Sequence, residues 1–154
     1  MNKENKARLT ALERAHLMEK YPSVPEHALA MSKWSDTSAN GLTKCVTAFI
    51  QMSGYQAERI NTMGVYREAS KVKDVDGISR TVGKSKWTKS TSTAGSADIS
   101  ATIKGRSVKI EIKYGRDIQS DAQKKYQESI ERAGGIYLIV RNFDEFIMWW
   151  ENFT

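Results

Sequence analysis

The sequence predicts an α/β protein in which a mixed sheet is flanked by helices in three layers. Three observations predict this class: an alternating hairpin over residues 97–113, a short apolar run at residues 136–140 typical of a buried strand, and helical apolar periodicity around them. At 154 residues the chain has the size of one domain. We expect that domain at residues 41–154, preceded by a helical extension at residues 1–40.

The first forty residues differ in pattern from the rest. Residues 5–20 fit a helix with a thin apolar stripe, and the only two prolines, Pro22 and Pro25, follow it. Residues 26–34 fit a short second helix. Because the stripe is thin, we expect this extension to lie outside the core.

The core elements have clear boundaries in the sequence. A first helix is expected after Asn40 as N-cap, with Gly54 as its C-terminal stop, followed by an extended segment at residues 55–67. Residues 120–133 fit a helix with Ser120 as N-cap, and a last helix begins after Asn142. The order is helix, strand, hairpin, helix, buried strand, helix.

Residues 69–94 have almost no apolar periodicity. They hold six basic and two acidic residues, so they carry four of the chain's six net positive charges. We expect a basic loop with strand pieces at residues 81–88. A loop of this length is either a solvated surface segment or a functional one, here a flap that lies against a phosphate backbone.

The charge balance indicates the class of partner. A net charge of +6 and a pI of about 9.4 favour a polyanion, with nucleic acid ahead of an acidic membrane. The longest apolar runs are too short to span a membrane, and we expect no membrane association. One cysteine and two histidines exclude a disulfide framework and a cysteine-rich zinc site. Together with the absence of an apolar leader, they predict an intracellular, cytoplasmic location.

The hairpin at residues 97–113 carries the candidate chemistry. With Gly105-Arg106 as a two-residue turn, Asp98 lies opposite Lys113, and all the apolar residues fall on one face. Asp98 and Glu111 are then diagonal neighbours on the polar, solvent-facing side, roughly 7–8 Å apart at the backbone.

Two carboxylates at that spacing can hold a small hard cation, either Mg²⁺ or Mn²⁺, with the carbonyl of Ile112 as a third protein ligand. A water on such an ion loses a proton more easily, and Lys113 beside it can orient that water or offset developing charge. The arrangement suits hydrolysis of a phosphodiester. The alternative is that these residues are ordinary solvent-exposed charges on the outer face of a hairpin.

Three motifs resemble the PD-(D/E)xK nucleases, and most closely their VRR-NUC branch: Gly95-Ser96-Ala97-Asp98, Glu111-Ile112-Lys113 and Ser120-Asp121-Ala122-Gln123. The resemblance spans roughly residues 41–146, about two-thirds of the chain. It implies a restriction-endonuclease-like fold and a metal-dependent endonuclease that acts on DNA. Standalone members of the branch are similar to Holliday junction resolvases, which implies branched DNA as the substrate, a homodimer, and a phage or bacterial origin.

The resemblance also implies a role for each site residue. Asp98 and Glu111 would ligate the metal, and Lys113 would position the water or steady the transition state. Gln123 would reach the site from the first turn of its helix, although it fits equally well as the capping-box partner of Ser120.

Basic residues near the proposed site could contact phosphates, and each could equally be a surface charge. They are Arg59, Lys84, Lys86, Lys89, Arg116 and Lys124. Trp87 could stack on a base or pack as an anchor for the loop.

The chain departs from the family pattern at two points. Ala97 stands where the family often has proline, and residues 42–53 contain no Asp or Glu to serve a second metal, with Glu58 as the nearest substitute. One metal is therefore expected. Two rival functions follow from the same residues: a DNA-binding module that keeps the fold without turnover, and a basic structural protein whose hairpin charges are only surface.

Overall fold

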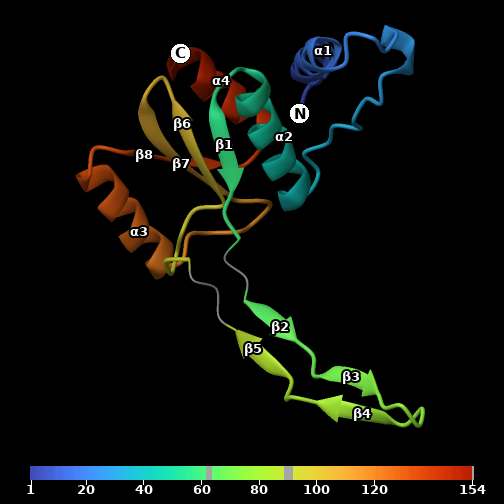
Figure 1. The fold of residues 1–154 in the computed structure, drawn as a ribbon. Helices are drawn as coiled ribbons and strands as arrows, with labels where there is room; N and C mark the ends of the chain where they lie inside the picture. The colour runs from blue at the N-terminus through green and yellow to red at the C-terminus, as the bar shows by residue number, and fades with distance from the viewer. Residues whose placement is uncertain (62–63, 89–91, 154) are drawn as a thin grey trace. The chain divides into compact units, whose positions relative to one another are not determined.

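The computed structural model describes residues 1–61, 64–88 and 92–153 and divides the chain into two compact units (Figure 1). Met1–Ile60 and Ala94–Thr154 form one unit, which we call the body. Asn61–Thr93 form the other, which we call the ribbon. Lys89, predicted to contact phosphate, lies outside the described residues.

The helices are α1 (Lys3–Lys20), α2 (Ala39–Met52), α3 (Asp121–Arg132) and α4 (Phe143–Phe153), with one turn of 3₁₀ helix at Glu26–Ala28. The strands of the body are β1 (Gln56–Arg59), β6 (Ile99–Ile103), β7 (Arg106–Ile112) and β8 (Ile136–Val140). Those of the ribbon are β2 (Val65–Arg67), β3 (Ser70–Lys73), β4 (Ser79–Val82) and β5 (Lys86–Thr88). None of the helices in the described part of the chain is both long and apolar enough to cross a membrane.

The body contains a mixed four-stranded sheet in the order β1-β6-β7-β8. β1, β6 and β7 are antiparallel, whereas β7 and β8 are parallel and are connected through α3. Helices α2 and α4 cover one face, and α3 lies on the other (Figure 1). The predicted mixed α/β class with flanking helices is therefore confirmed.

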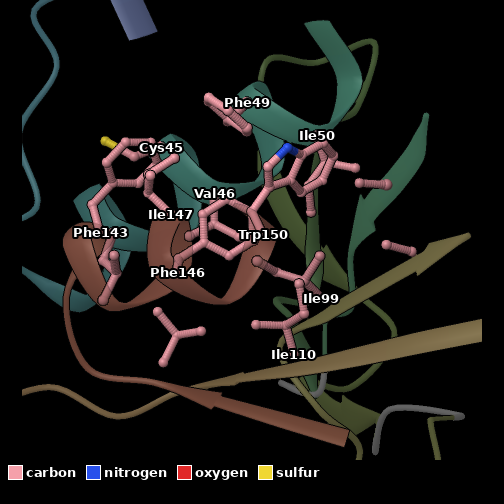
Figure 2. Close-up of a cluster of buried hydrophobic side chains, with 14 of the residues drawn as sticks. Cys45, Val46, Phe49, Ile50, Ile99, Ile110, Phe143, Phe146, Ile147 and Trp150 are labelled. Carbon is pink, nitrogen blue, oxygen red and sulfur yellow. The ribbon is translucent and has the colours of Figure 1, made fainter. Parts of the chain in front are cut away.

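The core forms between α2, α4 and the apolar face of β6 and β7. Alternate residues of these two strands, such as Ile99 and Ile110, are fully buried, as their two-residue period requires (Figure 2). Phe49 of α2 meets the edges of three aromatic rings of α4. The apolar periodicity of α2 and α4 thus marks the faces that pack, although α2 starts two residues earlier than expected, with Ser38 rather than Asn40 as its N-cap.

The prediction that residues 1–40 lie outside the core was wrong. Leu9 of α1 is 0% exposed and belongs to the core cluster together with Trp34. Between them, the buried carboxylate of Glu13 accepts hydrogen bonds from Trp34 Nε1 (2.8 Å) and from the amide of Ser32. The thin apolar stripe of α1 is enough to attach this helix to the core, because a single leucine and a single carboxylate make these contacts. The short helix expected at residues 26–34 is reduced to the single turn at Glu26–Ala28.

The hairpin turn also differs from the prediction. The turn residues are Lys104 and Gly105, both at positive φ (47° and 75°), so that Ile103 pairs with Arg106 and Ile99 with Ile110. Two positive φ angles define a type I′ turn, in which glycine favours the second position rather than the first. The two registers differ by a slide of two residues, which keeps every side chain on its face, so the alternation pattern fits both.

The basic loop expected at residues 69–94 is instead part of two antiparallel ladders. β2 pairs with β5 and β3 with β4. Between the ladders two residues (68–69) lie opposite three (83–85), so one side carries an extra residue, and Gly83 there has a φ of 86°. Trp87 lies across Gly64, because a Cβ on that glycine would come within 2.5 Å of the indole, yet its side chain stays 59% exposed.

Candidate active site

Glu111 and Lys113 lie at the end of β7, on the face of the sheet that α3 covers. Their exposed fractions are 2% and 4%. The expectation that Glu111 faces solvent was therefore wrong, because the polar face of the hairpin is the inner side of the third layer. A carboxylate and an ammonium buried this deeply need partners, since desolvation of a lone charge is costly.

Three side chains hold the carboxylate of Glu111. Gln123 donates from Nε2 to Oε1 (2.5 Å), and Lys113 Nζ lies 3.1 Å from the same oxygen. Tyr137 of β8 donates its hydroxyl to Oε2 (3.3 Å). Both oxygens are thus oriented by groups from α3 and β8.

Gln123 serves both of the roles that the sequence left open. Gln123 and Ser120 form a capping box at the start of α3. The backbone N–H of Gln123 donates to the hydroxyl of Ser120, and the backbone N–H of Ser120 donates to the side-chain Oε1 of Gln123 (2.9 Å). The same Oε1 accepts from Lys113 Nζ (2.9 Å), while Nε2 is turned to Glu111. The cap therefore fixes the amide orientation that bridges the acid and the lysine.

Lys113 has a third acceptor that sequence reasoning missed. Asp117, in the loop before α3, lies 3.3 Å from Nζ, and its side chain is 56% exposed. The backbone of Lys113 continues the pairing of β7 with β8 through its N–H bond to Val140 (2.9 Å). The ammonium thus lies between a buried carboxylate and a solvent-accessible one.

Asp98 lies on the neighbouring strand, just before β6. Its Oδ2 accepts the N–H of Ile112 (2.9 Å), and its carbonyl accepts the N–H of Ile60, the residue after β1 (2.8 Å). One more pair in the observed register sets Asp98 opposite Glu111, so the predicted pairing with Lys113 was wrong. The two carboxylates are direct cross-strand neighbours on one face, closer than the diagonal arrangement expected. The N–H of Ile112 thus orients the carboxylate of Asp98.

Gly95 explains why a glycine precedes Asp98 by three residues. It has a φ of 78°, and a Cβ there would collide with the carbonyl of Ala122 in the first turn of α3. The segment leading to Asp98 therefore packs directly on the backbone that presents Gln123. This contact brings two of the three motifs together.

The electrostatics of Glu111 follow from its position. Burial raises the pKa of its carboxyl, the hydrogen bond from Lys113 opposes that rise, and the nearby charge of Asp98 adds to it. Burial and the charge of Glu111 also raise the pKa of Tyr137, so this phenol remains a hydrogen-bond donor at neutral pH. The site is a charge-dense carboxylate pair with limited access to water.

The predicted phosphate contacts are distributed over both units. Arg59 is exposed on β1 and donates to Asn40 (2.7 Å). Arg116 and Lys124 are exposed in the body, at the loop before α3 and on α3 itself, with Lys124 3.4 Å from Asp121. Lys84 and Lys86 are exposed in the ribbon.

The site has two carboxylates as its hard oxygen ligands. In the described part of the chain no group of three or more His, Cys, Asp or Glu side chains gathers in one place. Two carboxylates fit Mg²⁺, which retains several waters and needs few protein ligands, better than they fit Ca²⁺ or zinc. No family model matches this chain, and no curated protein matches it.

Proposed function

We propose that this protein is a metal-dependent DNA endonuclease of the PD-(D/E)xK superfamily, similar to its VRR-NUC branch, with a restriction-endonuclease-like body. The main support is the buried Glu111 carboxylate, set opposite Asp98 and held by Gln123 next to Lys113. These four residues come from three different elements and converge at one end of the hairpin. A surface role of the hairpin charges does not account for the burial of Glu111 and Lys113.

The donor set is suited to one Mg²⁺ ion, with Mn²⁺ as the alternative, bound by Asp98, Glu111 and the carbonyl of Ile112. Such an ion, when bound, supplies an acidified water and offsets negative charge on a phosphate. Burial and the Asp98 charge disfavour the ionised form of Glu111, and a divalent cation would relieve both effects. α2 has no acid for a second ion, because its sequence from Ala39 to Met52 contains neither Asp nor Glu.

The other groups of the site would orient the two carboxylates and the attacking water, and would not bind the metal themselves. The Ile112 N–H fixes one oxygen of Asp98. Gln123 and Tyr137 fix the two oxygens of Glu111. Lys113 keeps its ammonium in one place through three acceptors, where it would orient a water or stabilise charge on a scissile phosphate.

The proposed substrate is DNA, with branched or junction-containing DNA preferred and a homodimer as the acting form. The net charge of +6 favours a polyanion. The exposed cations near the site, Arg116 and Lys124, lie on the loop and helix that carry Asp117 and Gln123. A phosphate backbone that crosses the end of β7 would pass beside them.

The proposal is tested by incubating the protein with linear, flapped and four-way DNA, with and without Mg²⁺. We expect cleavage only with the ion, and we expect Glu111→Gln to abolish it, because loss of a metal-ligating carboxylate removes the activated water. Glu128→Gln is the matched control, since Glu128 is an exposed carboxylate on α3. Cleavage retained by freshly purified Glu111→Gln protein would overturn the assignment.

The absence of an acid on α2 favours a second candidate, a DNA-binding module that retains the fold without turnover. Such a module would bind DNA equally well with and without Mg²⁺ and would leave all three substrates intact. The same incubation, combined with a binding measurement in EDTA, separates the two functions.

A further inference from the structure

The ribbon carries its cations in an arrangement that is unfavourable for the isolated protein. In the ladder of β2 and β5, Arg67 pairs directly with Lys86, so two positive side chains share one face at cross-strand distance. Like charges directly opposite each other destabilise a pair of strands. Tyr66 and Trp87 form the adjacent pair and share the opposite face.

The second ladder has the same two-sided character. Lys71 and Lys73 of β3 lie on one face with their partners Thr81 and Ser79, and this face contains no acid. All strand positions of this ladder are exposed. Each ladder therefore presents one face whose only charges are positive.

Most of the ribbon's cations have no acidic partner in the part of the chain that the structure describes. Of the ribbon residues that the structure describes, only Arg80 forms an ion pair, with Asp74 at 3.3 Å. Residues 61–93 hold seven basic and three acidic residues, a net charge of +4. The cations without an acidic partner among the described residues are Arg67, Lys71, Lys73, Lys84 and Lys86.

We propose that the basic faces of the ribbon bind the phosphates of a DNA duplex, with the two-stranded ribbon lying along a groove. This inference takes DNA as the polyanion from the proposed function and does not depend on cleavage. A two-stranded β-ribbon fits the major groove, which is about 12 Å wide. Phosphates would relieve the repulsion between Arg67 and Lys86, which no acidic side chain among the described residues offsets through an ion pair.

A membrane surface fits the ribbon less well than a duplex does. Interfacial binding needs a continuous apolar face. The less basic face of the β3–β4 ladder alternates Val72 and Val82 with Ser70 and Arg80. The turn beyond it holds Asp74 and Asp76, which anionic headgroups would repel.

The test compares two fourfold variants with equal charge change, both in the Glu111→Gln background and without Mg²⁺. The ribbon variant is Arg67→Gln/Lys71→Gln/Lys73→Gln/Lys86→Gln. The control, Lys3→Gln/Lys6→Gln/Lys20→Gln/Lys33→Gln, changes four exposed lysines at the N-terminal end of the body. Affinity for a linear duplex is measured between 50 and 200 mM salt, with anionic vesicles as a second probe.

We expect the ribbon variant to lose about tenfold or more in duplex affinity and to reduce the slope of log K against log salt by about 3 to 4, since each phosphate contact contributes about 0.9. The control should change both quantities far less. Equal losses in the two variants, an unchanged slope in the ribbon variant, or binding to vesicles in preference to the duplex would overturn the inference.

A measurement on the unmutated chain covers the case in which the ribbon variant folds poorly. Reductive methylation of lysines with and without duplex should show protection of Lys71, Lys73 and Lys86 and none of Lys3 and Lys6; uniform protection would contradict the inference. If the unmutated protein never cuts DNA but these lysines are protected, the proposed function fails and the ribbon inference stands. If the protein cuts DNA but these lysines are not protected, the ribbon inference fails and the proposed function stands.

Discussion

Gln123 shows how one side chain can serve both stability and chemistry. Its side-chain amide completes the capping box of α3 and also bridges Glu111 and Lys113 by hydrogen bonds. Both functions use the same orientation of the amide, because Oε1 faces two donors and Nε2 faces the carboxylate. The cap thereby holds the site residue in place.

Two substitutions separate these functions. Ser120→Ala removes the hydroxyl that accepts from the Gln123 amide, and we expect a loss of about 1 kcal/mol in unfolding free energy with most cleavage retained. Gln123→Ala should cost similar stability and also reduce the rate of cleavage by tenfold or more, because Glu111 and Lys113 lose their common partner. Equal rates in the two variants would show that Gln123 is only a cap.

A second prediction at this scale concerns Gly95. Alanine there meets both an unfavourable φ and the carbonyl of Ala122, whereas alanine at Gly105 meets only the unfavourable φ, with nothing within 4 Å. We expect Gly105→Ala to cost about 1–2 kcal/mol in unfolding free energy and Gly95→Ala to cost more and to slow cleavage. Chemical denaturation measures the first effect. Equal losses of unfolding free energy and equal cleavage rates in the two variants would show that the close contact of Gly95 with α3 is not required.

At the scale of elements, one carboxylate connects the N-terminus to α4. Asp36 accepts from the Met1 ammonium (2.7 Å) and from the N–H of Phe143 (3.1 Å), the first residue of α4. The hydrogen bond from the ammonium and the Phe143 N–H together lower the pKa of the Asp36 carboxyl, despite the opposing effect of its burial. Asp36 in turn raises the pKa of the ammonium. These contacts, with Leu9, attach α1 to the core.

The pH dependence of stability follows from these two shifts. A lowered carboxyl pKa stabilises the fold above its ordinary value of 3.8 and loses that effect as pH falls through the folded pKa. A raised ammonium pKa stabilises below 8.0 and loses the effect as pH rises through the folded pKa. We expect Asp36→Asn to lower Tm by a few degrees at pH 6–7, with the difference from the wild type shrinking toward pH 3 and above pH 8.

Thermal unfolding followed by circular dichroism between pH 3 and 9 measures this dependence. Asp76→Asn, an exposed carboxylate in the ribbon, is the matched control. A difference in Tm between Asp36→Asn and wild type that stays constant across the range would contradict the ion pair.

At the scale of the whole molecule, the ribbon is an insertion between two adjacent strands. β1 and β6 pair antiparallel, and the pairing extends to the bond between Ile60 and Asp98. The core cluster contains none of the ribbon residues that the structure describes. A much shorter connection could therefore join the two strands.

We expect replacement of residues 61–93 by a short Gly/Ser turn to leave the Tm of the body within a few degrees of the wild type, because the core cluster is built from described residues of the body alone. Thermal unfolding followed by circular dichroism measures this Tm. If the protein cleaves DNA, the shortened chain should cleave less because it binds DNA less tightly, while the rate of the chemical step stays the same. A fall in Tm of more than about 10 °C would show that the ribbon stabilises the body.

The sequence by itself determined helices α2, α3 and α4, strands β6, β7 and β8, and the apolar faces that α2, α4, β6 and β7 bury. Local rules suffice for these features: the helical period of α2 and α4, the alternation of β6 and β7, and the Ser120 cap of α3 are properties of neighbouring residues. The alternation of the hairpin placed Asp98, Glu111 and Lys113 among the candidates, and the resemblance of the motif Ser120–Gln123 to a nuclease family added Gln123.

Only the tertiary structure decided what lies against what. The register of the hairpin, the burial of Glu111 under α3 and the arrival of Tyr137 and Asp117 depend on packing between distant segments, on which local periodicity is silent. Leu9 enters the core although its helix looked peripheral, since one well-placed side chain does not produce a periodic signal. Strand pieces were expected at residues 81–88, where β5 and the end of β4 lie, but the pairing of the ribbon strands escaped prediction. The side chains of β3, β4 and β5 are exposed on both faces, so no alternation of apolar and polar residues marks the ladders.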